Sequence, residues 1–175
     1  SDSQLCTQLT RASTSKEHYR FSLSRSGLVV PCIVDAQGRS TPLQSIMDPA
    51  REAERLISTL SGPLFLVILG LAGGDLVEAA LDHGGISGIL VIEYGIDGLA
   101  ELFASRSYHR IIQSPRVKIL VDPDNDQIRS YLESNYRPAF SGGLSVLPIR
   151  QRVACDPVLF QGASDAVRTS LSSMS

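Results

Sequence analysis

A glycine-rich turn followed by an acidic residue is the part of this sequence whose spacing could do chemistry. The small residues of the turn are Gly70, Ala72, Gly73 and Gly74, and Glu93 lies 19 positions after Gly74. Small residues between a strand and a helix let the backbone approach a ligand closely, next to the N–H groups that open the helix. An acidic residue about 20 positions on accepts hydrogen bonds from a ribose diol. The spacing therefore predicts a pocket for a nucleotide-type cofactor.

Two departures from the glycine motif bear on which ligand the pocket takes. Ala72 replaces the central glycine of a Gly-x-Gly-x-Gly turn, and Asp75 puts a negative charge at the start of the helix. That charge suits the helix dipole but repels a pyrophosphate. S-adenosylmethionine, which has a nucleoside and no bridging diphosphate, is easier to reconcile with Asp75 than a nucleotide is, although both stay open. Asp122, at the end of a later apolar run, is a candidate contact for the adenine side.

A purely structural interpretation of the same residues stays open. The glycines then make only a tight turn between a strand and a helix, and Asp75 only complements the helix dipole. In that interpretation Glu93 and Asp122 cap loops and bind no ligand.

Other kinds of site find no support in the composition. The chain has 175 residues, with 16 Lys and Arg against 18 Asp and Glu, so the basic surface of a nucleic-acid-binding protein is missing. Its three cysteines and three histidines are scattered without metal or redox spacing, so we expect no metal. A nucleophile elbow, a phosphate-binding loop and a close pair of acids are also missing from the sequence. We therefore assign no catalytic residue.

Hydropathy argues against a membrane protein. The longest apolar run, at 64–69, is far shorter than the ~20 residues that cross a bilayer. No basic segment followed by an apolar one opens the chain, so we predict a cytoplasmic protein without a secretory signal.

Alternation of apolar runs with helix-forming segments predicts how the candidate residues are positioned. Four strands are expected, at 64–69, 87–92, 117–121 and 144–149, with helices between them. Such alternation is typical of βαβ units and a parallel sheet. We therefore predict an α/β, Rossmann-like (methyltransferase-like) fold over 63–150, a short parallel sheet with helices on both faces.

The segment before this core, 1–62, is expected to hold an arm, a β-hairpin and a helix. Its first sixteen residues are polar and aperiodic, and fit a short helix or a loose arm. Two β-rich runs then flank Arg25-Ser26-Gly27, and Pro31 should push the second run to a sheet edge or a bulge. Asp48 as the cap and Pro49 as the first helical residue predict an amphipathic helix over 49–60. The remaining segment, 151–175, is expected to be helical and to lead into a further domain.

Three segments together carry a resemblance to a known family. They are Ser24-Arg25-Ser26-Gly27 in the hairpin, the helix start Ser45-Ile46-Met47-Asp48-Pro49-Ala50-Arg51-Glu52-Ala53, and the strand that runs into Gly70-Leu71-Ala72-Gly73-Gly74, followed by Val91-Ile92-Glu93. Over 19–159 the chain resembles the N-terminal region of the Maf (motility-associated factor) glycosyltransferase-like family, which is related to the MptE-like pterin diphosphokinases. Gly70, Gly74 and Glu93 are the pocket positions that this resemblance supports.

The resemblance implies a Rossmann-like accessory domain of a longer bacterial protein involved in flagellin glycosylation with nucleotide-activated nonulosonic acids. In that family the transferase site lies in a following domain with a Gly-Pro-Ser motif, which does not occur here. Catalysis is therefore expected outside this chain. The partners it implies are a downstream domain of the same protein or a second copy, and a nucleotide or nucleotide-sugar. A minimal or degenerate S-adenosylmethionine-dependent methyltransferase and a protein-interaction module are the alternatives.

Overall fold

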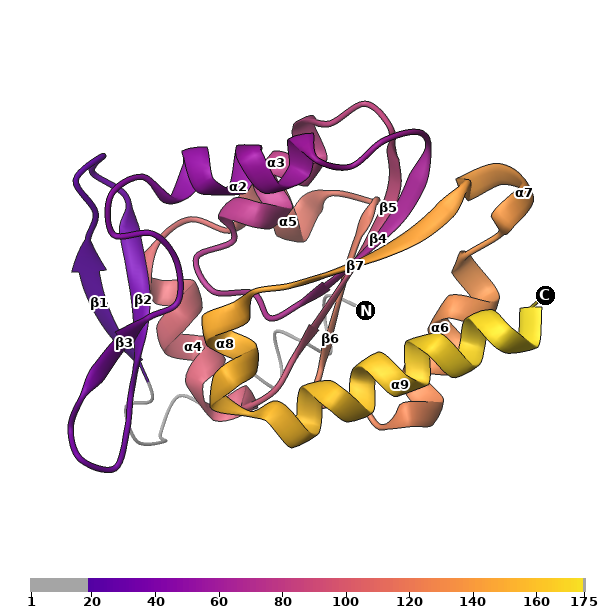
Figure 1. The fold of residues 1–175 in the computed structure, drawn as a ribbon. Coiled ribbons are helices and arrows are strands. Elements are labelled where there is room, and N and C mark those ends of the chain that lie inside the picture. Colours follow the sequence, from indigo (N-terminus) through magenta and orange to yellow (C-terminus); the bar gives the residue numbers. More distant parts are fainter. Residues whose placement is uncertain (1–18, 175) are drawn as a thin grey trace.

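The computed structural model describes residues 19–174, so the arm expected at 1–16 lies outside the described residues. Four parallel strands form the main sheet (Figure 1): β4 (Leu64–Leu69), β5 (Ile86–Glu93), β6 (Val117–Val121) and β7 (Gly143–Pro148). Their order is β6-β5-β4-β7. The chain thus builds outward from β4 through β5 to β6, and then returns to place β7 on the other side of β4. The predicted α/β class with a parallel sheet is confirmed.

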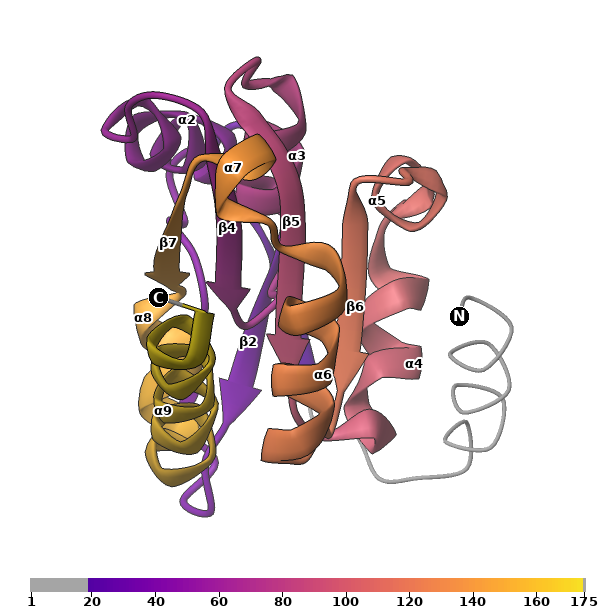
Figure 2. The same cartoon turned by 90° about the vertical axis from the view of Figure 1, so that its right-hand side faces the viewer.

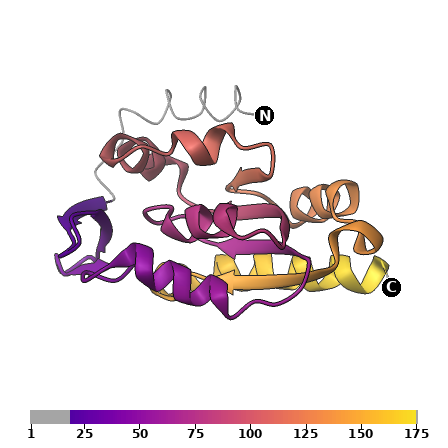
Figure 3. The same ribbon diagram turned by 90° about the horizontal axis from the view of Figure 1, so that it is seen from above.

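Helices cover both faces of this sheet (Figures 2 and 3). One face carries α2 (Pro49–Ser58), α3 (Asp75–Asp82), α4 (Ile96–Ser105) and α5 (His109–Gln113), and the other carries α6 (Asn125–Asn135) and α9 (Pro157–Met174). Every residue of β4 is buried, as expected of a central strand with helices above and below. Each face of the sheet has its own hydrophobic core, the first under α2 to α5 and the second under α6 and α9. Because side chains alternate along a strand, Leu66 and Ile68 lie in the first core, and Phe65 and Val67 lie in the second.

A second, antiparallel sheet precedes the main one, with β1 (Tyr19–Leu23), β2 (Val29–Val34) and β3 (Ser40–Pro42) in the order β1-β2-β3. The predicted hairpin is β1–β2, and β3 extends it. The expected edge position for Pro31 is wrong, because β2 is the central strand. Pro31 lies just beyond the residues of β2 that pair with β3, and its carbonyl accepts a hydrogen bond from Leu43 N at 3.0 Å. Proline is tolerated there because the pairing with β3 stops at this point and needs no N–H group from residue 31.

Local capping signals predicted the start of α2. The Asp48 side chain accepts a hydrogen bond from Arg51 N at 3.1 Å, with Pro49 as the first helical residue. The helix ends at Ser58, two residues before its predicted end. Two short helices were not predicted, α5 and α7 (Pro138–Ser141), whereas α8 (Arg150–Cys155) lies almost wholly in the segment that was expected to be helical. The boundary expected after residue 150 falls inside α8. Within residues 19–174, no helix combines the length and apolarity needed to cross a membrane.

Candidate functional site

The glycine turn joins β4 to α3 and is held tightly by the protein itself. Gly70, Ala72 and Gly74 all have positive φ angles, of 97°, 49° and 82°. Ala72 is an uncommon residue for this conformation, and its carbonyl accepts a hydrogen bond from Tyr108 Oη at 2.8 Å. Gly73 N donates to Gln44 Oε1, also at 2.8 Å. The Gly73 N–H group, at a position predicted to face a ligand, is therefore already used.

Glu93 ends β5 and meets the glycine turn, as its spacing in the sequence predicted. Its side chain is fully buried. One carboxylate oxygen accepts from Leu71 N at 2.9 Å, and the other accepts from Tyr94 N at 2.8 Å. Burial raises the pKa of Glu93 above its ordinary value, although a neighbouring arginine and these two N–H groups oppose the shift.

The arginine beside Glu93 is Arg152 from α8, which the sequence did not single out. Its Nη2 lies 2.8 Å from Glu93 Oε1 and donates to the Tyr94 carbonyl, while Nη1 donates to Asp156 Oδ2 at 2.5 Å. Its guanidinium carbon lies 5.1 Å from the centre of the Phe160 ring. The whole side chain is only 3% exposed.

Arg152 also lies directly over the glycine turn. A Cβ atom added at Gly70 would be 2.8 Å from Arg152 Cγ, so the arginine stem occupies the space that this glycine leaves open. Arg152 Nε is buried and has no hydrogen-bond partner among residues 19–174. Burial lowers the pKa of Arg152, but Glu93, Tyr19 and Asp156 together outweigh that effect and raise the pKa above its ordinary value. An ion pair within the protein thus fills the crevice that the motif assigns to a nucleoside.

Asp75, at the start of α3, is buried and forms an ion pair with Arg106. Arg106 holds its carboxylate with two bonds, of 2.9 Å and 3.1 Å, and Gln44 Nε2 donates a third at 2.8 Å. The negative charge that was expected to select against a pyrophosphate is therefore balanced by Arg106.

Asp122 follows β6 in a left-handed conformation, with a φ angle of 48°. Its two carboxylate oxygens accept hydrogen bonds from Gly95 N at 2.8 Å and Ile96 N at 3.1 Å, at the start of α4. This geometry is that of a helix cap supplied from a neighbouring loop.

Comparison with solved structures gives a likeness over nearly the whole chain. The structure of a Maf glycosyltransferase from Magnetospirillum magneticum AMB-1 matches 95% of this chain with a TM-score of 0.50 and 15% sequence identity. The fold is similar to that of a Maf glycosyltransferase. The predicted resemblance is thus confirmed at the level of the fold, and the chain spans 33% of the length of that protein.

Two structures of spermidine synthase are also similar. The enzyme from Thermotoga maritima matches 67% of this chain, and 53% of its own, with a TM-score of 0.40 and 16% identity. A spermidine synthase in complex with the transition-state analogue AdoDATO matches 88% of this chain, and 63% of its own, with a TM-score of 0.45 and 14% identity. No protein-family profile matches the sequence, and no curated protein is significantly similar to it.

In this Maf-like fold the predicted ribose contact, Glu93, is fully buried and paired with Arg152. A ribose could reach Glu93 only if Arg152 moved away, so the arrangement described here does not fit that ligand. Ligand binding by Gly70, Gly74, Glu93 and Asp122 stays a prediction. No group of three or more His, Cys, Asp or Glu residues suited to a metal ion occurs in the described part of the chain.

One signal in the sequence could have indicated Arg152. Glu93 ends a strand directly after four apolar residues, Ile89 to Ile92, and a carboxylate at such a position has to be paired once it is buried. That requirement calls for a cation, but the sequence does not say which of its 16 basic residues supplies it.

Proposed function

We propose that this chain is a cytoplasmic, Rossmann-like accessory domain of a Maf-like glycosyltransferase of the flagellin-glycosylation type. The transferase centre then lies outside the chain. Three family-like segments of the sequence and the likeness of fold support this proposal. The match covers 95% of this chain but only 33% of the Maf glycosyltransferase, as expected if the chain corresponds to one part of such a protein.

The buried Arg152–Glu93 pair is the observation that carries the accessory role. A Rossmann-like domain that binds a cofactor keeps its acidic residue accessible to the ribose. Here that residue is fully buried and bonded to Arg152 and two backbone N–H groups. The same observation disfavours the alternative of a degenerate methyltransferase, since S-adenosylmethionine would compete with an ion pair already in place.

Calorimetric titration tests this role. The chain is titrated with S-adenosylmethionine and with a nucleotide-activated nonulosonic acid, and release of nucleotide from the sugar donor is followed in parallel. We expect neither binding nor nucleotide release. Glu93→Gln serves as a control, because a ligand held by the ribose contact would bind this variant more weakly. Binding of S-adenosylmethionine that Glu93→Gln abolishes, while circular dichroism shows this variant to be folded, would replace the accessory role by the methyltransferase alternative.

The partner of this accessory domain is proposed to be another domain of the same protein, which docks beside the start of α9. Val158 and Leu159 lie there with 84% and 47% of their surface exposed. A second copy of the chain is the other candidate partner. Light scattering distinguishes them, because self-association that Val158→Ser weakens would favour the second copy, whereas a concentration-independent monomer favours the domain.

A further inference from the structure

A pocket of about 290 Å³ lies next to the carboxyl end of β7. Its walls come from α2 and the loop before it, from the start of α3, and from the segment where β7 passes into α8. This is the switch point of the sheet, since β5 and β7 flank β4 on opposite sides. Open α/β sheets bind ligands in the crevice outside the carboxyl ends of their strands at such a point.

The inner wall of this switch-point pocket is apolar. It includes Leu43, Ala53, Leu76 and Ile149, each no more than 8% exposed. Ligand pockets commonly measure about 300–1,000 Å³ and combine an apolar lining with a few polar groups. A pocket at the small end of that range suits a compact molecule with an apolar body.

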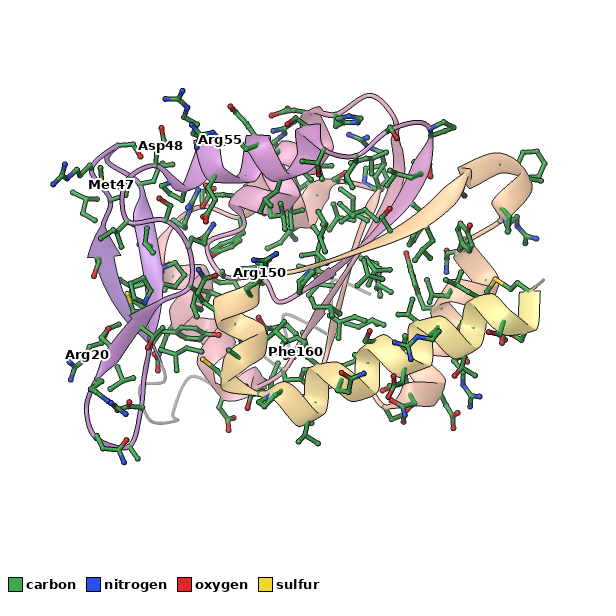
Figure 4. The ribbon with its side chains drawn as sticks, in the orientation of Figure 1. Arg20, Met47, Asp48, Arg55, Arg150 and Phe160 are labelled. Atoms are coloured by element: carbon green, nitrogen blue, oxygen red, sulfur yellow. The ribbon has the colours of Figure 1, made fainter. Side chains whose placement is uncertain are left out.

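Two opposite charges line the same pocket from different elements. Glu52 comes from α2, and Arg150 comes from the start of α8, where Figure 4 shows it between α8 and α2. The two side chains do not form an ion pair with each other, and Arg150 forms none with any of residues 19–174. Glu52 Oε2 accepts one hydrogen bond, from Ser45 N at 2.8 Å.

We propose that the switch-point pocket binds a compact zwitterion of the amino-acid type with an apolar side chain. The guanidinium of Arg150 takes the carboxylate, since its fork of N–H donors matches two carboxylate oxygens. The Glu52 carboxylate accepts hydrogen bonds from the ammonium group, and the apolar body lies against Leu76 and Ile149. A simple anion would be repelled by Glu52 and a simple cation by Arg150, whereas a molecule with both charges satisfies both.

Titration of the ¹⁵N-labelled chain with leucine, followed by NMR, tests the proposal. N-acetylleucine, which lacks the ammonium charge, and leucinamide, which lacks the carboxylate, are the matched probes. We expect leucine to shift the amide signals of Ala53, Leu76 and Ile149, and each analogue to bind about tenfold more weakly, or about 1.4 kcal/mol. Equal affinity for leucine and either analogue, or no shift at these residues, would overturn the proposal.

Variants assign the two charges separately. Arg150→Gln should weaken leucine binding about tenfold and remove the preference over leucinamide, because the missing carboxylate then costs nothing. Glu52→Gln should likewise weaken leucine binding about tenfold and remove the preference for leucine over N-acetylleucine. The amide oxygen of the new glutamine side chain can still accept the hydrogen bond from Ser45 N. Arg55→Gln is the control, since Arg55 lies on α2 outside this pocket. A loss of binding in the control as large as in Arg150→Gln would contradict the assignment. The analogue series uses the unmodified chain, so it stands even if a variant fails to fold.

Discussion

The Arg152–Glu93 pair is the residue-scale feature on which the interpretation of this chain depends. Removing two charges from water costs several kcal/mol for each ion, and only good geometry with further hydrogen bonds recovers that cost. Here Glu93 also accepts from Leu71 N and Tyr94 N, and Arg152 also donates to the Tyr94 carbonyl and Asp156. Each member is therefore tolerated only because the other is present.

Replacing Arg152 alone should destabilise the fold strongly. Arg152→Met leaves the Glu93 carboxylate buried without its cation, and we expect a loss of about 3–5 kcal/mol in the free energy of unfolding. Urea denaturation at neutral pH measures this loss. The double variant Arg152→Met/Glu93→Gln is the control and should recover much of it, since no uncompensated charge then remains. A double variant no more stable than Arg152→Met would contradict this account.

The same variant should show a distinctive dependence on pH. Burial holds the pKa of Glu93 in the folded chain above its unfolded value, so the folded state binds more protons and stability falls as pH rises between the two values. Removing the Arg152 charge raises the folded pKa further and extends this interval upward. We therefore expect the deficit of Arg152→Met relative to the unmodified chain to shrink from about pH 8 to about pH 5. Unfolding free energies measured across that range check this, and a constant deficit would be evidence against it.

At the scale of elements, the sequence predicted what local signals determine. The cap at Asp48 was predicted because a capping side chain bonds to a backbone N–H only three residues away. The central strand β4 was found because a strand buried on both faces is continuously apolar. The short helix α8 has six residues and no side-chain cap, so nothing local marks where it begins. The position of α8 depends on the tertiary contact between Arg152 and Glu93.

Asp122 shows how a predicted ligand residue can act as a cap. Asp122→Ala should cost about 1 kcal/mol, because the Gly95 and Ile96 N–H groups lose their acceptor. Asp122→Asn should lose less, since asparagine keeps one acceptor oxygen and tolerates a positive φ angle. Urea denaturation of both variants checks this order. Equal losses would mean that the cap contributes nothing.

The glycine turn allows the cost of backbone strain to be separated from the cost of a clash. Gly70 and Gly27 have similar φ angles, of 97° and 91°, but an added Cβ at Gly70 lies 2.8 Å from Arg152 Cγ while one at Gly27 meets nothing within 4 Å. Gly27→Ala should therefore cost only the conformational strain, about 1–2 kcal/mol. Gly70→Ala should cost more, because Arg152 must also shift. Thermal unfolding of the two variants measures the two losses of stability. Equal losses would show that the Arg152 side chain shifts away from residue 70 at no cost in free energy.

At the scale of the whole molecule, the two cores share one sheet but depend on different parts of the chain. The first core takes residues from the N-terminal segment as well as from the helices α2 to α5, since Tyr19 of β1 and Leu43, directly after β3, belong to it. The second core is covered by α6 and α9, with Phe160 near the start of α9 (Figure 4). The sequence assigned 63–150 to a core of its own because strand patterns identify the sheet but not the helices that will cover its second face.

Truncation after Ile149 tests whether 63–150 can hold its fold without the segment that follows. The truncated chain loses Arg152, which pairs with Glu93, and Phe160, which is 1% exposed in the second core. Loss of a buried Phe side chain alone costs about 3–5 kcal/mol, and an unpaired buried Glu93 costs a similar amount, whereas a whole domain is stable by only about 5–15 kcal/mol. We therefore expect no cooperative thermal unfolding, measured by near-ultraviolet circular dichroism. Phe160→Ala in the full chain is the milder control and should unfold cooperatively at a lower temperature. A truncated chain that unfolds cooperatively near the temperature of the full chain would instead show that the core folds without 151–175.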